Sequence, residues 1–204
     1  MLTIYGHPAS TCTRKVLMTC AENEIPFDMS MVDIFAGAHK QPPHTDRQPF
    51  GRIPAISDDG FDLHESRAIC RFLNEKYQGK LVPGDAQTRA TMEKWISIET
   101  SEFTGNAMKF IYEHIFKRPQ GQQVLDDAQK GLEAALSAMD KQLGKTDYLA
   151  GSEFTLGDVM YMPYTDYCMA TPAKEIFAKY PNVMKWWKRV SERPTWKKAT
   201  GAAA

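Results

Sequence analysis

The sequence predicts two domains, an α/β domain with a four-stranded mixed sheet and, after it, an all-α domain. Two observations support this fold class. Alternation of apolar and polar residues with a period of two, which is typical of strands, recurs up to residue 65 and almost disappears beyond residue 85. Of the 204 residues, 43% are hydrophobic and 25% are charged, so the chain can bury a sizeable core.

The first half of the chain contains a βαβ unit followed by a ββα unit. Strands are expected at 2–5, 25–34, 53–57 and 61–65, and helices at 13–23 and 65–77, with a polar loop over 36–49. The last two strands are separated by Asp58-Asp59-Gly60, a hairpin turn sequence. This order is the layout of a thioredoxin-like domain, although the order alone fits other small α+β folds.

Helical periodicity dominates the second half of the chain. Amphipathic segments lie near 86–116, 121–143, 156–169 and 174–192. Gly79, Pro83 and Gly84 interrupt the pattern before them. We therefore expect a thioredoxin-like domain over 1–78, a linker over 79–85 and an all-helical domain over 86–204.

Charge and composition argue against several classes of partner. Lys+Arg and Asp+Glu number 25 each, so neither nucleic acid nor an anionic membrane is expected as a partner. The N-terminus does not resemble a signal peptide, and the four cysteines are widely spaced, which predicts a cytoplasmic protein with reduced thiols. The five histidines show no ligand spacing, so we expect no metal and no permanently bound cofactor.

Pro54 stands before an expected strand, where it donates no backbone hydrogen bond. One explanation is a cis Ile53–Pro54 bond, which turns the backbone groups of Ile53 out of the sheet. Ile53 could then pair with an extended peptide as a strand would. The alternative is a proline that simply begins a strand.

Two loops lead into the N-termini of expected helices. In HESRAI (64–69), free N–H groups and the helix dipole favour an anion, while Glu65 could hold an ammonium group. In GHPASTCTRKV (6–16), a hydroxyl of Ser10 or Thr11 could donate a hydrogen bond to a bound thiolate and lower its pKa. Ordinary helix capping by Ser, Thr and Glu also explains both loops.

Several motifs in the same order resemble the cytosolic glutathione transferases, most closely the phi class. The matching segments are GHPASTCTRKV (6–16), AHK (38–40), PFGRIPA (49–55), HESRAI (64–69) and YLAGSEFTLGDV (148–159). The last segment is similar to the N-capping box of a core helix in the second domain. The resemblance covers almost the whole chain and implies the glutathione transferase fold.

The resemblance implies a role for each matching residue. Ser10 corresponds to the catalytic serine, and Phe50 to an aromatic residue that contacts the neighbouring subunit of a homodimer. The expected glutathione-binding residues are His39, Lys40, Arg52, Ile53, Pro54, Glu65 and Ser66. Phi enzymes usually have glutamine at the position of Arg52, so this cation either meets the glycyl carboxylate or is a solvated side chain.

The expected function is conjugation of glutathione, as a thiolate, to small hydrophobic electrophiles, with reduction of organic hydroperoxides as a further activity. Phe35, Tyr112 and Phe116 match positions of the hydrophobic substrate site, but each would also suit an ordinary core. One alternative is a non-catalytic ligand-binding or assembly protein of the same fold. Another is a thiol transferase that depends on Cys12, a residue that we expect to pack into the helix as a small apolar side chain.

Overall fold

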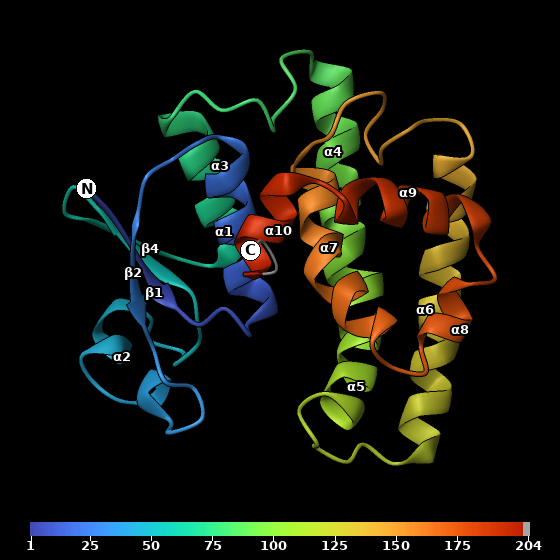
Figure 1. The fold of residues 1–204 in the computed structure, drawn as a ribbon, viewed down its shortest axis with the longest axis horizontal. Helices are drawn as coiled ribbons and strands as arrows, with labels where there is room; N and C mark the ends of the chain where they lie inside the picture. Colours follow the sequence, from blue (N-terminus) through green and yellow to red (C-terminus); the bar gives the residue numbers. More distant parts are fainter. Residues whose placement is uncertain (202–204) are drawn as a thin grey trace. The chain divides into compact units, whose positions relative to one another are not determined.

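A computed structural model describes residues 1–201 of the chain. The chain forms two compact units, one comprising Met1–Val82 with the segment that begins at Pro194, and the other comprising Pro83–Arg193. Figure 1 shows the sheet in the first unit and the long helices of the second. The two units are described separately below.

The first unit is built on a four-stranded sheet with the order β2-β1-β3-β4. Its strands are β1 (Leu2–Gly6), β2 (Asp28–Met31), β3 (Ala55–Asp58) and β4 (Phe61–His64). β1 pairs parallel with β2 and antiparallel with β3, and β3 pairs antiparallel with β4. The sheet is therefore mixed, as the sequence predicted.

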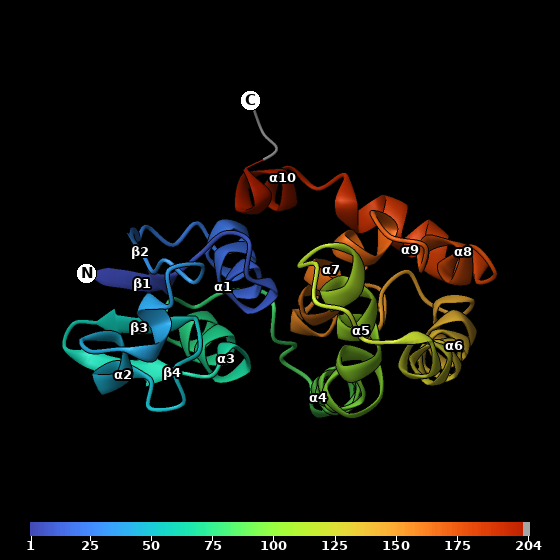
Figure 2. The same cartoon turned by 90° about the horizontal axis from the view of Figure 1, so that it is seen from below.

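Helices cover both faces of this sheet. α1 (Thr11–Glu22) and α3 (Ser66–Lys76) pack against each other on one face, while the short helix α2 (His44–Arg47) lies on the other side (Figure 2). The core between the sheet and the helix pair consists of fully buried apolar residues, including Leu2, Ile4, Val16, Ile56, Ile69 and Leu73. Burial of this apolar surface is the main force that holds the helices on the sheet.

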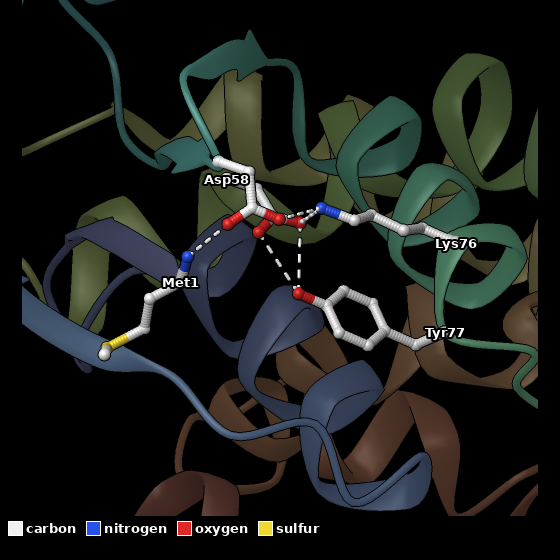
Figure 3. Close-up of polar contacts among 5 residues, drawn as sticks. Met1, Asp58, Lys76 and Tyr77 are labelled. Carbon is white, nitrogen blue, oxygen red and sulfur yellow. Dashed lines mark hydrogen bonds and ion pairs between the residues drawn. The ribbon is translucent and has the colours of Figure 1, made fainter.

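An ionic cluster joins the β3–β4 turn to the end of α3 (Figure 3). Lys76 Nζ lies 2.9 Å from the buried carboxylate of Asp58 and 2.8 Å from that of Asp59, and the Tyr77 hydroxyl donates to both oxygens of Asp58 at 3.1 Å. The amino group of Met1 also pairs with Asp59.

The hydrogen bond from Lys76 and the Met1 ammonium lower the pKa of Asp59 to about 2. The pKa is lower in the folded chain than in the unfolded one, so this contribution to stability is present above roughly pH 4. It is lost as the pH falls through about 2. Because Asp59 and Met1 are largely exposed to solvent, the contribution is small.

The second unit consists of helices packed around aromatic and aliphatic side chains. Its elements are α4 (Ala86–Ile98), the π-helical segment η2 (Glu99–Phe103), α5 (Thr104–His114), α6 (Gln122–Leu143), α7 (Leu156–Met169), α8 (Lys174–Phe177) and α9 (Pro181–Ser191). Phe103, Tyr161 and Phe177 are fully buried, with Phe103 4.8 Å from Tyr161 and 6.3 Å from Phe177 between ring centroids. α7 is buried along most of its length and so forms the centre of this unit.

Asp158 organises the start of α7. Thr155 caps the helix, and the Asp158 carboxylate accepts hydrogen bonds from the backbone N–H groups of Thr155 and Leu149, both at 3.0 Å. Trp186 of α9 donates its indole N–H to the same carboxylate at 2.9 Å. Burial raises the pKa of Asp158, and these donors oppose the rise. One buried carboxylate thereby links a loop, a helix terminus and a second helix.

The structure differs from the predicted elements at several boundaries. The expected helix at 86–116 is divided by the π-helical turn of η2, and the expected helix at 174–192 is divided before Pro181, which begins α9. The predicted strand at 25–34 is paired only over Asp28–Met31. These differences arise because periodicity does not mark where hydrogen bonding changes register.

A further helix, α10 (Pro194–Thr200), packs against α1 within the first unit, with Trp196 and Ala199 buried. The sequence placed these residues in the helical domain. The predicted domain boundaries at 78 and 86 stay a prediction. The structure groups the chain differently at one place, because α10 lies in the first unit. Across residues 1–201, no helix is long and apolar enough to span a membrane.

We predict that Asp158→Asn lowers the free energy of unfolding by at least about 2 kcal/mol, because a carboxamide cannot accept from all the donors and leaves buried N–H groups unpaired. Asp126→Asn is the matched control, since Asp126 is exposed and accepts one bond, from Gln122 in its own helix. Urea unfolding of both variants measures the difference. Equal stability of the two variants would show that the buried network is not needed.

Candidate functional site

Strand pairing brings three loops together at one end of the sheet. Tyr5 of β1 pairs with Ala55 of β3, and Ala55 pairs with His64 of β4. Neighbouring strands lie about 4.8 Å apart, so the segments that follow β1, precede β3 and follow β4 are adjacent. These are the segments in which the sequence placed Ser10, Ile53 and Glu65. The ionic cluster around Asp58 lies at the opposite end of the same pairing, since Asp58 pairs with Leu2 and Phe61.

Ser10 is the N-cap of α1. Its backbone is extended, and its Oγ accepts a hydrogen bond from the Thr13 N–H at 3.2 Å. The hydroxyl proton of Ser10 has no acceptor among residues 1–201, so it is available to donate outward. The oxygen of this hydroxyl group caps the helix and its proton can be donated, so helix capping and donation to a bound thiolate are compatible roles for Ser10.

The Ile53–Pro54 peptide bond is cis, which is one of the two explanations that the sequence left open for Pro54. β3 begins at Ala55, and neither the N–H nor the C=O of Ile53 has a hydrogen-bond partner within the described part of the chain. Both groups lie at the end of the sheet where the three loops meet. Ile53 can therefore form paired backbone hydrogen bonds with an extended peptide.

Glu65 and Ser66 open α3. Glu65 is exposed and is the N-cap, with φ 72° and ψ 104°, a conformation that L residues rarely adopt. Such a backbone costs about 1–3 kcal/mol and tends to occur at functional sites. Ser66 is the first helical residue and is buried, and the N–H groups of the first turn are available to an anion. An ammonium group and a carboxylate on one carbon would suit this pair of features.

A cationic group lies beside the cis-proline segment. His39 and Lys40 belong to the short helix η1 (Ala38–Lys40), and Lys40 Nζ donates to the Phe50 carbonyl at 3.4 Å. Gly51 lets the two segments approach, because a Cβ there would lie 2.8 Å from Lys40 Cδ and 2.9 Å from the His39 carbonyl oxygen. The exposed Arg52 follows directly. Lys40 and Arg52 supply cationic donors, and His39 a ring nitrogen, of the kind that can bind a terminal carboxylate.

The aromatic residues predicted for a hydrophobic site divide between the two units. Phe35 is 73% exposed, follows β2 and has its ring 5.5 Å from His7. Tyr112 lies in α5, and its ring is 6.2 Å from that of Phe116. Tyr112 and Phe116 have the i, i+4 spacing that predicts one shared helix face, but α5 ends at His114 and Phe116 lies beyond it, so that prediction is wrong.

The cysteines differ in their surroundings. Cys12 is half-buried in the first turn of α1, two residues after Ser10. Cys20 and Cys70 are buried, and burial raises the pKa of both thiols, to about 11 for Cys70. Burial likewise raises the pKa of Cys168. A high pKa keeps these three thiols protonated at neutral pH, which leaves Cys12 as the cysteine relevant to the rival thiol chemistry.

Sequence reasoning missed α2, which lies inside the segment 36–49 that was expected to be a loop. Two of its side chains hold the backbone next to Ile53: His44, and Gln48 at the end of the helix. The spacing of these residues, i and i+4, was the available signal, but the prolines around it favoured a loop. No group of three or more His, Cys, Asp or Glu that could hold a metal ion occurs within residues 1–201.

Comparisons with known proteins identify the family. Residues 9–76 match the glutathione S-transferase N-terminal domain, and residues 103–194 match the C-terminal domain. Glutathione S-transferase F7 of Arabidopsis thaliana is 34% identical, over 96% of this chain and 97% of that protein. Glutathione S-transferase hmp2 of Hypomyces subiculosus is 35% identical, over 100% and 99%. The crystal structure of glutathione transferase F7 from Populus trichocarpa has a TM-score of 0.93 and 34% identity, covering 98% of each chain.

The chain belongs to the glutathione S-transferase family, and its F-type relatives place it in the phi class. It is accordingly a transferase that acts on glutathione. The predicted fold is thereby confirmed, with a mixed four-stranded sheet in the first unit and helices in the second.

We predict that Gly51→Ala weakens glutathione binding by about tenfold, because its Cβ would displace η1 from the cis-proline segment and spoil a preformed site. Gly60→Ala is the control: Gly60 also has positive φ, at 85°, but a Cβ there would meet nothing within 4 Å. Both variants carry a similar backbone cost of about 1–2 kcal/mol. Calorimetric titration with glutathione separates them, and equal affinities would contradict the role of this close approach.

Proposed function

We propose that this protein is a serine-type glutathione transferase in which Ser10 stabilises the glutathione thiolate. The proposal rests chiefly on the geometry of Ser10, whose Oγ caps α1 through the Thr13 N–H while its proton remains free to donate. The positive end of the α1 dipole favours an anion at the same point. Ser10 stabilises the thiolate and does not remove its proton.

The three loops at the end of the sheet provide separate contacts for the parts of glutathione. We assign the cysteinyl backbone to the N–H and C=O of Ile53, beside the cis Pro54. The γ-glutamyl carboxylate would accept from the first turn of α3 at Ser66, and its ammonium would pair with Glu65. The glycyl carboxylate would accept from His39 and from the cations Lys40 and Arg52.

The chemical step follows from this binding mode. A free thiol with a pKa near 8.5 is mostly protonated at neutral pH, and a depression of about two units, worth roughly 2.7 kcal/mol, makes most of it thiolate. The thiol proton passes to solvent. The sulfur lone pair then forms a bond to the electrophilic carbon of the second substrate, and the leaving group departs with the bonding electrons, or the electrons move to the acceptor end of a conjugated system.

We propose that Phe35, Tyr112 and Phe116 contact the hydrophobic electrophile. The exposure of Phe35 supports a contact role, because a large apolar side chain in solvent carries a cost that binding removes. The aromatic pair Tyr112 and Phe116 extends to Tyr167, whose ring lies 5.9 Å from that of Phe116. Small hydrophobic electrophiles fit such a surface.

We further propose a homodimer and a cytoplasmic location. Phe50 is 63% exposed beside His64, at the position where the family places an aromatic contact to the neighbouring subunit. Phe61 is 50% exposed and packs on Phe72, so β4 and α3 present further apolar surface. The free thiols of all four cysteines support a reducing compartment.

We predict that Ser10→Ala lowers kcat at least a hundredfold while the Kd for glutathione changes by less than about threefold, because the hydroxyl acts on the thiolate and not on the peptide backbone. The loss of the cap lowers the stability of the protein by about 1 kcal/mol. Stopped-flow kinetics with a chromogenic electrophile gives kcat, and thiolate absorbance against pH gives the bound thiol pKa, which should rise.

Cys12→Ser is the companion variant. It should retain conjugation at close to the original rate, because Cys12 contributes no group to the serine-type step. Activity lost in Cys12→Ser but kept in Ser10→Ala would instead establish the thiol transferase. A Kd that rises by the same factor as kcat falls in Ser10→Ala would mean that Ser10 binds glutathione and does not act on its thiolate.

We predict that Phe50→Ala weakens the dimer, since an exposed aromatic anchor supplies a large share of the binding energy of an interface. Sedimentation velocity at falling protein concentration should show monomer appearing at a concentration at least tenfold higher than for the original chain. Val124→Ala, which removes an exposed apolar side chain from α6 in the other unit, is the control. A monomeric original chain would overturn the proposed homodimer.

A further inference from the structure

Helix α2 holds the backbone that precedes the cis-proline. The Gln48 side-chain oxygen accepts from the backbone N–H of Phe50 at 2.7 Å and of Arg52 at 3.4 Å. The ring of His44, one helical turn earlier, has its Nε2 2.6 Å from the Arg52 carbonyl oxygen. Both polar backbone groups of Arg52 are thereby fixed by one short helix.

Both side chains are shielded from solvent. His44 is 4% exposed and Gln48 is 1% exposed. A carbonyl oxygen can only accept, so the Nε2 atom of His44 bears the proton and donates it. The other ring nitrogen, Nδ1, is buried without a hydrogen-bond partner in the described part of the chain. The one hydrogen bond of the ring is therefore directed at Arg52. The unpaired Nδ1 carries a desolvation cost that a buried apolar side chain would not have.

Helix α2 is itself attached to the sheet close to the same point. The Arg47 guanidinium lies over the Tyr5 ring, 4.3 Å from its centroid. Tyr5 is the residue that pairs with Ala55, directly after Pro54. Ile53 and Pro54 are therefore flanked on one side by Arg52, held by α2, and on the other by Ala55, held by β1. Ile53 is left as the residue whose N–H and C=O are available to a ligand.

We propose that His44 is a positioning residue for glutathione binding, which acts through the Arg52 carbonyl to fix the direction of the Ile53 backbone groups. His44 touches neither the substrate nor the reacting sulfur. This inference rests on the proposed role of Ile53 in binding glutathione, and it predicts a change in affinity for glutathione without a change in the chemical step. The electrophile site is not affected.

The test compares His44→Phe with His44→Gln. Phenylalanine fills the buried space but has no donor, whereas the side-chain NH2 of glutamine can occupy a position close to that of Nε2. We expect His44→Phe to raise the Kd and the KM for glutathione about tenfold, the size expected for one buried hydrogen bond. At saturating glutathione, kcat and the KM for the electrophile should stay within twofold. His44→Gln should restore the affinity to within about threefold of the original.

Thr45→Val, a change at the next residue of the same helix, is the matched control and should leave glutathione affinity unchanged, because no side-chain hydrogen bond of Thr45 holds the Arg52 backbone. Calorimetric titration with glutathione measures Kd without requiring turnover. If the original chain does not bind glutathione, the proposed function fails before His44 is tested.

If the original chain binds glutathione, three results would each overturn the role of His44. The first is an unchanged Kd in His44→Phe. The second is an equally weak Kd in His44→Gln. The third is a fall in kcat by the same factor as the rise in KM. Thermal unfolding of each variant shows whether it is folded, and His44→Gln decides the question should His44→Phe not fold.

Discussion

The candidate site depends on the register of three strands. Because Tyr5, Ala55 and His64 lie side by side in the sheet, the loops after β1, before β3 and after β4 begin within about two strand spacings of one another. A shift of one residue in either pairing would turn the buried side chains of the sheet toward solvent, so burial of Ile4 and Ile56 enforces the register. The hydrophobic core thus positions polar groups that contribute nothing to the core themselves.

Contacts at the opposite end of the sheet also help to position the loops of the candidate site. Asp58 is buried at the end of β3, and Lys76 and Tyr77 at the end of α3 satisfy its carboxylate. α3 is therefore attached at its C-terminus to the β3–β4 turn (Figure 3). Its N-terminus carries Glu65 and Ser66. Fixing one end of an 11-residue helix limits how far the other end can move, which keeps the strained Glu65 backbone in place.

In the second unit, Asp158 has the corresponding structural role. Its carboxylate accepts from the loop at Leu149, from the helix cap and from Trp186, so one buried charge connects α7 with α9 and with the preceding loop. A buried carboxylate is tolerated because its hydrogen-bond donors replace the water it loses. The aromatic residues Tyr112 and Phe116 lie outside this network, on α5 and the chain that follows it, so the proposed contact with the electrophile is separate from the centre of the unit.

The sequence by itself determined the order of the strands and of the longer helices and the change from a mixed sheet to helices, because periodicity and motif spacing are local properties. It left two explanations of Pro54 open, and the structure selects the cis Ile53–Pro54 bond. It also located Ser10 and Glu65 at helix N-termini, where capping residues are recognisable from the chain. Tertiary structure alone decided the packing of α10 against α1, the π-helical turn at Glu99, and the contacts of His44 and Gln48 with Arg52. These features depend on which groups meet after the chain has folded, and the prolines around His44 and Gln48 outweighed the helical spacing of these two residues, which was the one local signal of α2.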